Sequence, residues 1–445
     1  MRPAAAVPIL ILAVAVACAP PSPEITADTE PDATRGPVRV GLERLGEAEI
    51  TIATESGPAG GGSALDHLAG KRLGLVVHAA SVTADGRHAI DVLTGHGLDV
   101  TRLFSPEHGL RGRAAAGEKV ESGHDPATGL PVVSLYGKVH KPRPEDLAGL
   151  DVLVFDLQGA GVRFYTYVST LILVLEAAAE NDLEVVVLDR PNPLGGRRVE
   201  GPLAAPRDVV PASFVNRAPG PLVHGLTMGE MALTVNAGRL DAIELGVVAM
   251  AGWSREMTWA DTGRPWVSPS PNLRSAEASL AYPGVALLEA TNVSEGRGTA
   301  EPFLFFGAPW LAGESLEIAV PGFELEPVRF TPRKSPAAPW VKHADVECAG
   351  WRVKVTDPSV AEPYRLGVEL VTALSRLPDF EWRREGEALT WLLGTDRVFA
   401  GLASGLSAQE IVAADRADHE AWRREVASHL LYPGLASSAG DGSEG

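Results

Sequence analysis

One short stretch, residues 103–112, combines residue types that acid–base chemistry requires. Its sequence, Leu-Phe-Ser-Pro-Glu-His-Gly-Leu-Arg-Gly, starts as the end of an apolar segment and breaks at Pro106. Glu107, His108 and Arg111 then follow, interrupted by glycines. A carboxyl group held in such a loop is a candidate general acid. The alternative is a tight turn whose charged side chains are only solvated.

The segments on either side of this loop alternate between strands and helices. Apolar strands are predicted at 72–77, 98–104, 131–136, 151–157 and 184–188, and helices at 88–96, 142–147 and 167–181. Continuous apolar strands that alternate with helices indicate a parallel sheet covered on both faces. The predicted fold class is therefore α/β, with a Rossmann-like catalytic domain over residues 45–220. Because no Gly-x-Gly-x-x-Gly follows the first strand, no dinucleotide is expected, and no other cofactor.

Polar side chains follow these strands at their carboxyl ends. They are His78, Glu107, His108, Tyr136, Asp156, Gln158, Asp189, Arg190 and Asn192. Open α/β sheets bind their ligands at this edge, so the residues are expected to form one substrate-binding cluster. Any single member could instead be a helix cap or a turn residue.

The second half of the chain is predicted to form an α+β domain over residues 225–435. Helices are expected at 228–237, 363–376, 387–393, 407–414 and 418–431, and strands at 246–250, 285–289 and 351–355. Two of its loops carry polar groups. The loop 268–272 ends in Asn272, and the loop 291–299 places Glu295 beside Arg297 between glycines.

These pieces suit the cleavage of a carbohydrate. The chain has nine Trp residues, whose faces can bury sugar rings, and it has carboxylates at several strand ends. Glycoside cleavage needs a carboxylic acid that protonates the leaving oxygen and a second group opposite it. Glu107 is the predicted acid, and Asp156, Asp189 and Glu295 are candidates for the second carboxylate. The motifs of nucleophile-elbow esterases, penicillin-binding enzymes and zinc peptidases do not occur, and no metal site is expected.

The N-terminus has the layout of an export signal. Arg2 is followed by an apolar run, residues 4–17, and then by Cys18, which resembles a bacterial lipobox. We expect a signal peptide over 1–18 with a lipidated Cys18, a disordered linker over 19–44 and a disordered tail over 436–445. The protein would then be exported and anchored as a lipoprotein at the periplasmic face or the cell surface. The alternative is a cleaved secretory signal without a lipid.

The charge balance excludes some partners. The net charge of −18 argues against binding to nucleic acid or to anionic membrane surfaces, so membrane contact is expected only through the lipid anchor. With Cys18 lipidated, Cys348 has no disulfide partner and is expected to be a buried structural cysteine.

Several motifs closely resemble one known family. They lie at residues 104–112, 129–137, 163–167, 188–196, 200–202, 266–272, 282–284 and 291–299. In order and with few gaps, they match the exo-acting β-N-acetylmuramidases of peptidoglycan recycling, between about residues 71 and 432. That family was long described only as a domain of unknown function.

The resemblance implies a fold, an activity and a site. It implies a Rossmann-like domain joined to a smaller α+β domain, with the active site in the cleft between them. The family removes N-acetylmuramic acid from the non-reducing end of peptidoglycan fragments, so the expected partner is a muropeptide or a peptidoglycan-derived saccharide. Its catalytic glutamate falls on Glu107. An arginine should bind the lactyl carboxylate, and the candidates within the motifs are Arg163, Arg190 and Arg297. Further substrate-binding candidates in the matched motifs are Arg111, Tyr165, Asn272 and Asn292.

Two departures from the family keep a second interpretation open. The family usually has Thr-Asn-Gln where this chain has His78-Ala79-Ala80, and Asp where it has Gly159. Gly159 favours the alternative of a lipoprotein that binds cell-wall fragments but has lost turnover. The second catalytic group also stays open between Asp156, Glu295 and the acetamido oxygen of the substrate. His108 either orients Glu107 or caps its turn.

Overall fold

The computed structural model describes residues 37–54, 57–206, 210, 213–239 and 243–432. The expected signal peptide with Cys18, most of the expected linker and the expected tail over 436–445 lie outside these residues. Within the described part of the chain, we find no helix with both the length and the apolar character needed to span a bilayer.

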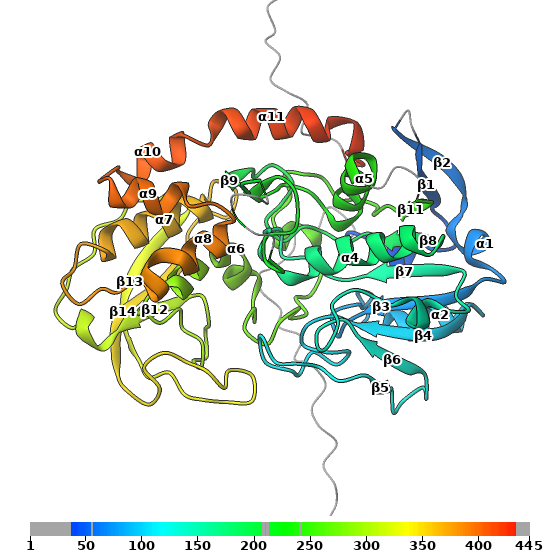
Figure 1. Ribbon diagram of the computed structural model, residues 1–445, viewed down its shortest axis with the longest axis horizontal. Coiled ribbons are helices and arrows are strands. Elements are labelled where there is room, and N and C mark those ends of the chain that lie inside the picture. The colour runs from blue at the N-terminus through cyan, green and yellow to red at the C-terminus, as the bar shows by residue number, and fades with distance from the viewer. Residues whose placement is uncertain (1–36, 55–56, 207–209, 211–212, 240–242, 433–445) are drawn as a thin grey trace, which may run out of the picture.

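A large sheet of nine strands forms the core of the first domain (Figure 1). From edge to edge its strands are β2 (Gly57–Ser63), β1 (Glu49–Thr54), β11 (Leu245–Val248), β8 (Glu184–Leu188), β7 (Val152–Asp156), β3 (Arg72–Val77), β4 (Asp99–Ser105), β6 (Pro131–Ser134) and β5 (Gly123–His124). The six strands from β11 to β6 are parallel, whereas β2, β1 and β5 pair antiparallel with their neighbours. In chain order the parallel strands run 3-2-1-4-5-6 from β6 to β11, the order of the Rossmann fold.

Both faces of this sheet are buried, as the continuous apolar strands predict. Val152 and Val154 of β7 pack toward α1 (Ala64–Leu68) and α2 (Ala89–Gly95), whereas Leu153 and Phe155 pack toward α4 (Thr166–Glu180) and α5 (Met228–Arg239). This alternation follows from the two-residue period of a strand. The short helix α3 (Pro144–Leu147) leads into β7.

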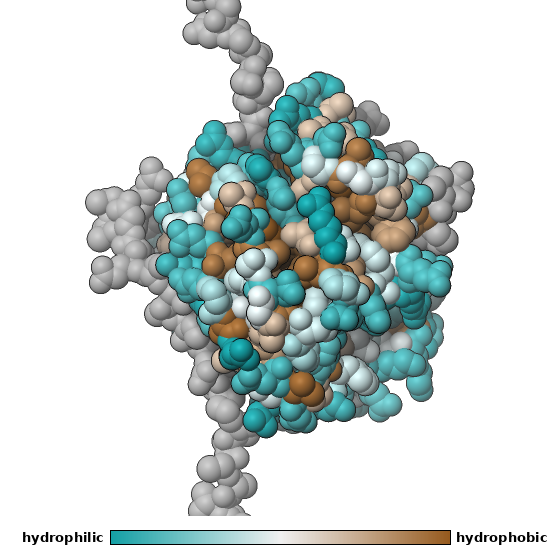
Figure 2. Space-filling view, turned by 90° about the vertical axis from the view of Figure 1, so that its left-hand side faces the viewer, coloured by the Kyte–Doolittle hydropathy of each residue, from teal (hydrophilic) through white to brown (hydrophobic). Residues whose placement is uncertain are grey.

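The second domain is smaller and has an antiparallel sheet. Its strands are β12 (Phe305–Ala308), β14 (Cys348–Val355) and β13 (Phe323–Phe330), with β14 in the middle. Its helices are α6 (Ala276–Val285), α7 (Pro363–Leu374), α8 (Glu387–Leu393), α9 (Arg397–Ala403) and α10 (Ala408–Ala413). The expected burial of Cys348 is confirmed. Figure 2 views the molecule from this end, where hydrophobic side chains are interspersed with hydrophilic ones.

The two domains share one hydrophobic core and are tied together by the last α-helix that the structure describes. A single apolar cluster runs from α4 and α5 to β14 and α7. The helix α11 (Arg416–Val426) crosses from the second domain back to the small ladder of β9 (Glu200–Leu203) and β10 (Pro221–Val223) (Figure 1). This shared core gives the two domains a fixed junction.

Three expectations about this organisation are wrong. The first domain does not end near residue 220, because β11 pairs with β8 inside the large sheet. Residues 285–289 are not a strand, because α6 continues there into the 3₁₀ turn η3 (Ala286–Ala290). A run of four apolar residues, Val285 to Leu288, fits either structure. Residues 37–44 are not a disordered linker, since Val38 and the 3₁₀ turn η1 (Gly41–Arg44) pack into the fold.

Candidate active site

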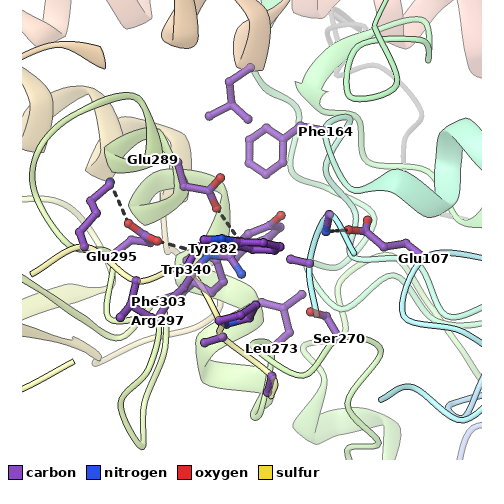
Figure 3. Close-up of a pocket in the computed structure, with 18 of the residues that line it drawn as sticks. Glu107, Phe164, Ser270, Leu273, Tyr282, Glu289, Glu295, Arg297, Phe303 and Trp340 are labelled. Carbon is purple, nitrogen blue, oxygen red and sulfur yellow. Dashed lines mark hydrogen bonds and ion pairs between the residues drawn. The ribbon is translucent and has the colours of Figure 1, made fainter. Parts of the chain in front are cut away.

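A cavity of about 930 Å³ lies between the two domains (Figure 3). One wall comes from the loop after β4 and the start of α4, and it carries Glu107. The opposite wall comes from α6, the loop after η3 and the segment 334–343. The expected cleft between a Rossmann-like domain and a smaller domain is therefore present, with Glu107 in its wall. Of the residues predicted for the site, those that line this cavity are Glu107, His108, Tyr136, Tyr165, Asn292, Glu295 and Arg297.

Glu107 is buried and held by neutral donors. The backbone N–H of Gly117 donates to Oε1 at 2.7 Å, and the Thr166 hydroxyl donates to Oε2 at 2.7 Å. Among the residues that the structure describes, no cation lies within ion-pair distance of this carboxyl group. Glu107 can therefore gain or lose a proton without breaking an ion pair.

His108 fixes the loop that carries Glu107. Its φ of 71° is left-handed, which is uncommon for a residue with a side chain and marks strain at functional loops. Its Nδ1 lies 2.8 Å from the carbonyl oxygen of Ala114, and because a carbonyl only accepts, Nδ1 carries the proton. Burial lowers the pKa of His108. The hydrogen bond is the one that the turn-capping interpretation predicts.

Tyrosines brace the same wall. The hydroxyls of Tyr165 and Tyr167 each donate to the carbonyl of Pro269 at 2.8 Å, which joins the start of α4 to the loop 268–272. The Tyr167 hydroxyl also lies 3.2 Å from the carbonyl oxygen of Glu107. Burial, followed by the negative charge of Glu107, raises the pKa of Tyr136. Its hydroxyl is therefore a neutral hydrogen-bonding group at the cavity.

The opposite wall holds Glu295 in a network of ion pairs. Its Oε2 accepts from Lys342 Nζ at 2.9 Å, and its Oε1 lies 3.3 Å from Arg297 Nε. Arg297 also donates to Glu289 at 2.8 Å and stacks on the ring of Phe303 (Figure 3). Burial raises the pKa of Glu295, but the charges of Lys342 and Arg297 outweigh burial and hold it below its usual value. Glu295 is thus a fixed anion.

Asp156 and Arg190, two expected site residues, form a buried ion pair away from the cavity lining. Both guanidinium Nε and Nη2 donate to the Asp156 carboxylate, the latter at 2.8 Å, and Nη1 donates to the carbonyl of Val82. Gln158 beside them donates to the carbonyls of Gly159 and Pro191. These contacts give the strand ends at the centre of the sheet a structural role.

Asp189 and Asn192 also hold the fold together. Asp189 accepts hydrogen bonds from the Thr227 hydroxyl, the Gly229 N–H and the Tyr432 hydroxyl, which ties the end of the described chain to the sheet. Burial raises the pKa of Asp189 to about 6. Asn192 donates to the carbonyl of Leu226 at 3.0 Å. Neither residue lines the cavity.

Three further residues that were predicted to contact the substrate do not line the cavity. Arg163 is fully buried and donates to the carbonyls of Pro202, Gly220 and Leu393. Arg111 pairs with Asp125 at 2.6 Å. His78 is buried 5.4 Å from the Tyr167 ring, centroid to centroid, and burial lowers its pKa well below the usual value.

Asn272 and Asn292 position loops at the cavity. Asn272 donates to the carbonyl of Ala337, a lining residue, at 3.3 Å, but does not itself line the cavity. Asn292 does line it, yet its side-chain amide bonds backbone groups of Asp379 and Glu381. The amide of Asn292 therefore holds a neighbouring segment in place.

Six of the lining residues that were not predicted from the sequence carry groups that can contact a ligand or a catalytic side chain. They are Thr166, Glu289, Lys334, Trp340, Lys342 and Arg383. Only Thr166 lies in a recognised motif, 163–167, where its position next to two tyrosines was a usable signal. Glu289 lies in η3 and Arg383 opens a short turn, whereas Lys334, Trp340 and Lys342 belong to a loop of the second domain that carries no periodic pattern.

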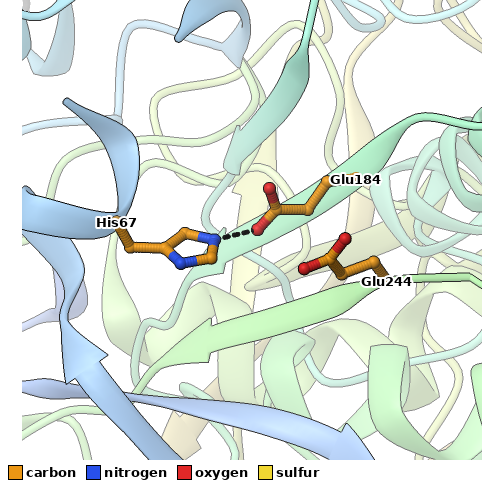
Figure 4. Close-up of side chains that lie close together, drawn as sticks. All are labelled: His67, Glu184 and Glu244. Carbon is orange, nitrogen blue, oxygen red and sulfur yellow. Dashed lines mark hydrogen bonds and ion pairs between the residues drawn. The ribbon is translucent and has the colours of Figure 1, made fainter. Parts of the chain in front are cut away.

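A group of potential metal ligands lies far along the sheet from Glu107. Within the described residues, His67, Glu184 and Glu244 bring their ligand atoms together (Figure 4). However, Lys71 Nζ lies 2.7 Å from Glu184 Oε2 and 3.2 Å from His67 Nε2. Glu184 therefore already has a cation as its partner, and we assign the group to an ion-pair cluster.

Comparisons with known proteins agree on one family. The model "Exo-beta-N-acetylmuramidase NamZ, N-terminal" matches residues 73–277, and its C-terminal counterpart matches residues 280–432. The chain is 39% identical over 373 residues to the peptidoglycan beta-N-acetylmuramidase NamZ of Bacillus subtilis, which covers 82% of this chain and 88% of the relative.

Solved structures show the same fold. Two crystal structures of DUF1343 family proteins from Bacteroides fragilis are each 29% identical to the chain, with TM-scores of 0.73 and 0.72. The matches cover 90% and 89% of this chain and 100% and 99% of those chains. With the family models and the Bacillus relative, they establish that the chain belongs to the exo-β-N-acetylmuramidase NamZ family of glycosidases.

Proposed function

We propose that this protein hydrolyses the bond that links a non-reducing terminal N-acetylmuramic acid to the rest of a peptidoglycan fragment. One observation carries the proposal: Glu107, buried in the wall of the interdomain cavity, is held by the neutral donors Gly117 and Thr166, and no cation among the described residues pairs with it. The name of the Bacillus relative supports the same substrate.

Glu107 acts as the general acid in this proposal. It protonates the leaving glycosidic oxygen as the bond to the sugar breaks. The Thr166 hydroxyl serves both states of Glu107, because a hydroxyl can donate to the carboxylate and accept from the protonated acid. The Gly117 N–H donates to the other oxygen of Glu107, so the orientation of the carboxyl group stays the same through the reaction.

The acetamido oxygen of the substrate is the second group that we favour. Asp156 is paired with Arg190 outside the cavity lining, and Glu295 is paired with Lys342 and Arg297. An attacking Glu295 would have to leave both cations in a buried site, which is costly. Attack by the substrate's own acetamido oxygen needs no such exchange, and it is an established variant of glycoside hydrolysis.

Aromatic side chains supply the surface that a sugar ring needs. Phe164, Tyr282, Phe303 and Trp340 line the cavity, and Trp340 is exposed over 72% of its residue surface. Trp340, Tyr282 and Phe303 belong to the second domain, and Figure 3 shows them across the cavity from Glu107. We propose that the indole of Trp340 stacks on the sugar of the leaving fragment.

The two departures from the family lie outside this cavity. Gly159 faces Met228, whose side chain a Cβ at position 159 would meet at 3.1 Å, and His78 is buried. Neither lines the cavity. These positions support turnover over the alternative of a lipoprotein that only binds cell-wall fragments.

We also propose that the protein is exported and tethered by a lipid on Cys18. The apolar run at residues 4–17 and the cysteine after it support this location. Metabolic labelling with a fatty acid checks it: the parent protein should carry the label, and Cys18→Ser should not. Label retained by Cys18→Ser would contradict a lipid on that cysteine.

The activity is tested with the protein lacking residues 1–18 on 4-nitrophenyl β-N-acetylmuramide. Release of 4-nitrophenol, and release of free N-acetylmuramic acid from a natural muramyl disaccharide, would support the proposal. Binding of N-acetylmuramic acid without any release would favour the binding lipoprotein. If a folded sample neither releases nor binds it, the substrate assignment is wrong.

A further inference from the structure

The charged side chains that line the cavity do not cancel. The cations are Arg297, Lys334, Lys342 and Arg383, and the carboxylates are Glu107, Glu289 and Glu295. Arg297 and Lys342 are paired with Glu289 and Glu295. In the described part of the chain, no carboxylate lies within ion-pair distance of Lys334 or Arg383. A chain with a net charge of −18 thus presents two uncompensated cations at this cavity.

Arg383 is the better placed of these two cations to recognise an anion. Its Nη1 donates to the carbonyl of Glu289 at 2.9 Å, which anchors the guanidinium at the cavity. No other described group accepts a hydrogen bond from this side chain. The remaining N–H groups are therefore available for the planar, two-pronged contact that arginine makes with a carboxylate.

The backbone around Arg383 is held in an unusual form. Arg383 opens the turn η5 (Arg383–Gly386), in which Arg384 and Glu385 have φ values of 52° and 53°. Two consecutive left-handed residues with side chains are costly, and they persist only where surrounding contacts enforce them. Strain of this kind concentrates at ligand-binding sites.

Asn292 holds the segment that leads into this turn. Its Nδ2 donates to the carbonyl of Asp379 at 2.8 Å, its Oδ1 accepts from the N–H of Glu381 at 3.1 Å, and its own N–H donates to the carbonyl of Glu381 at 3.0 Å. A bridge between Thr291 and Trp382 continues this pairing. The segment before Arg383 is thereby fastened to the loop that carries Glu295.

We propose that Arg383 binds the carboxylate of the lactyl group of the substrate, and that Asn292 positions it. This inference rests on the proposed function, because the lactyl carboxylate is what distinguishes N-acetylmuramic acid from N-acetylglucosamine. The arginines suggested by the sequence are all engaged: Arg163 with backbone carbonyls, Arg190 with Asp156, and Arg297 with Glu289 and Glu295. Arg383 is thus the specificity determinant for a charged muramyl end.

The test compares two substrates and two neighbouring arginines. Arg383→Gln is measured on 4-nitrophenyl β-N-acetylmuramide and on the corresponding β-N-acetylglucosaminide, which lacks the carboxylate. Arg384→Gln is the matched control, because Arg384 carries the same charge one residue further on but stacks on Trp391 and does not line the cavity. Arg383→Lys keeps the charge but loses the planar contact.

We expect Arg383→Gln to lower kcat/KM for the muramide about 10- to 100-fold, the scale of a hydrogen-bonded contact to a charged group. The loss should appear mainly in KM, with Arg383→Lys intermediate. The rate on the glucosaminide, however slow, should be unchanged, and Arg384→Gln should match the parent on both. Equal losses on both substrates, or no loss on the muramide, would overturn the assignment.

Binding separates this inference from the proposed function. If the parent protein does not turn over the muramide, binding is measured by calorimetric titration with N-acetylmuramic acid and with its uncharged lactyl amide. The comparison tests whether Arg383 binds the carboxylate. Preference for the acid that disappears in Arg383→Gln but persists in Arg384→Gln supports a carboxylate site at Arg383. Equal preference in all three proteins, or no binding by the parent, contradicts it.

Discussion

Glu107 and Glu295 face the same cavity from opposite domains, and both are buried, with 6% and 5% of their residue surfaces exposed. Their partners differ. Glu107 accepts hydrogen bonds from a backbone N–H and a hydroxyl, whereas Glu295 is paired with an ammonium and a guanidinium. A carboxyl group among neutral donors can exchange its proton, and a carboxylate between two cations cannot do so without losing both ion pairs.

This difference assigns separate roles to the two walls. The wall of the first domain carries the group that we propose transfers the proton. The wall of the second domain carries a rigid set of charges, Glu289, Glu295, Arg297 and Lys342, that shapes the cavity. Two carboxylates of the same type thus differ in function because of their immediate partners.

Removing one of the two cations that pair with Glu295 should have a large effect on the stability of the protein. Lys342→Met leaves Arg297 as the one cation that pairs with Glu295 among the described residues. We expect the free energy of unfolding at pH 7 to fall by about 2 kcal/mol. This is somewhat less than the cost of a buried charge that has no partner at all. Urea denaturation measures it. Lys354→Met, on an exposed pair, should cost far less.

The pH dependence of that effect follows from the lowered pKa of Glu295. A carboxyl group with a lowered pKa stabilises the fold above its unfolded pKa, near 4.5, and loses this contribution as pH falls through its folded pKa. The stability gap between the parent and Lys342→Met should therefore be full at pH 7 and narrow below about 4.5. If the difference in stability between the two proteins stays constant over this range, Lys342 does not stabilise the ionised form of Glu295.

A smaller effect is expected on the Glu107 wall. Thr166→Val removes the hydroxyl that donates to Glu107 and keeps the shape of the side chain. We expect kcat to fall about tenfold, the scale of one hydrogen bond to a charged group, with little change in KM. Thr166→Ser, which keeps the hydroxyl, should stay close to the parent. If Thr166→Val and Thr166→Ser have the same kcat, the hydroxyl of Thr166 does not assist Glu107.

The smallest effect is expected at the exposed tryptophan. Trp340→Ala should raise KM for a muramyl disaccharide about fivefold, the scale of a single aromatic contact of about 1 kcal/mol, and leave kcat unchanged. Trp391→Ala is the control, because Trp391 is also exposed but lies outside the cavity lining. Equal KM values for the two variants would remove Trp340 from the substrate contacts.

The sequence predicted the sheet because its strands are continuous apolar runs separated by helices. The same reasoning selected Glu107, which follows β4 in a loop with glycines at left-handed positions, Gly109 and Gly112. It failed for 285–289, where a short apolar run fits a helix as well as a strand, and for β11, whose pairing with β8 depends on the tertiary fold.

The site was predicted only in part, for a physical reason. The rule that polar groups gather at the carboxyl edge of a sheet holds, but it does not tell which of them are exposed to a ligand. Asp156 and Arg190 neutralise each other there, and Asp189 binds Tyr432 from the end of the described chain. Lys342 and Arg383 reach the cavity from loops whose sequences have no periodic signal, so only the fold reveals them.

The most direct test of the contrast between the walls replaces each glutamate by its amide. Glu107→Gln should lower kcat on a muramyl disaccharide by at least about 100-fold, the scale of losing a general acid, while its unfolding midpoint stays that of the parent. Glu295→Gln should lower the unfolding midpoint and retain much more of the activity. A Glu107→Gln protein that keeps parental turnover on the disaccharide, or a stable Glu295→Gln protein that loses it, would contradict the assignment of Glu107 as the acid.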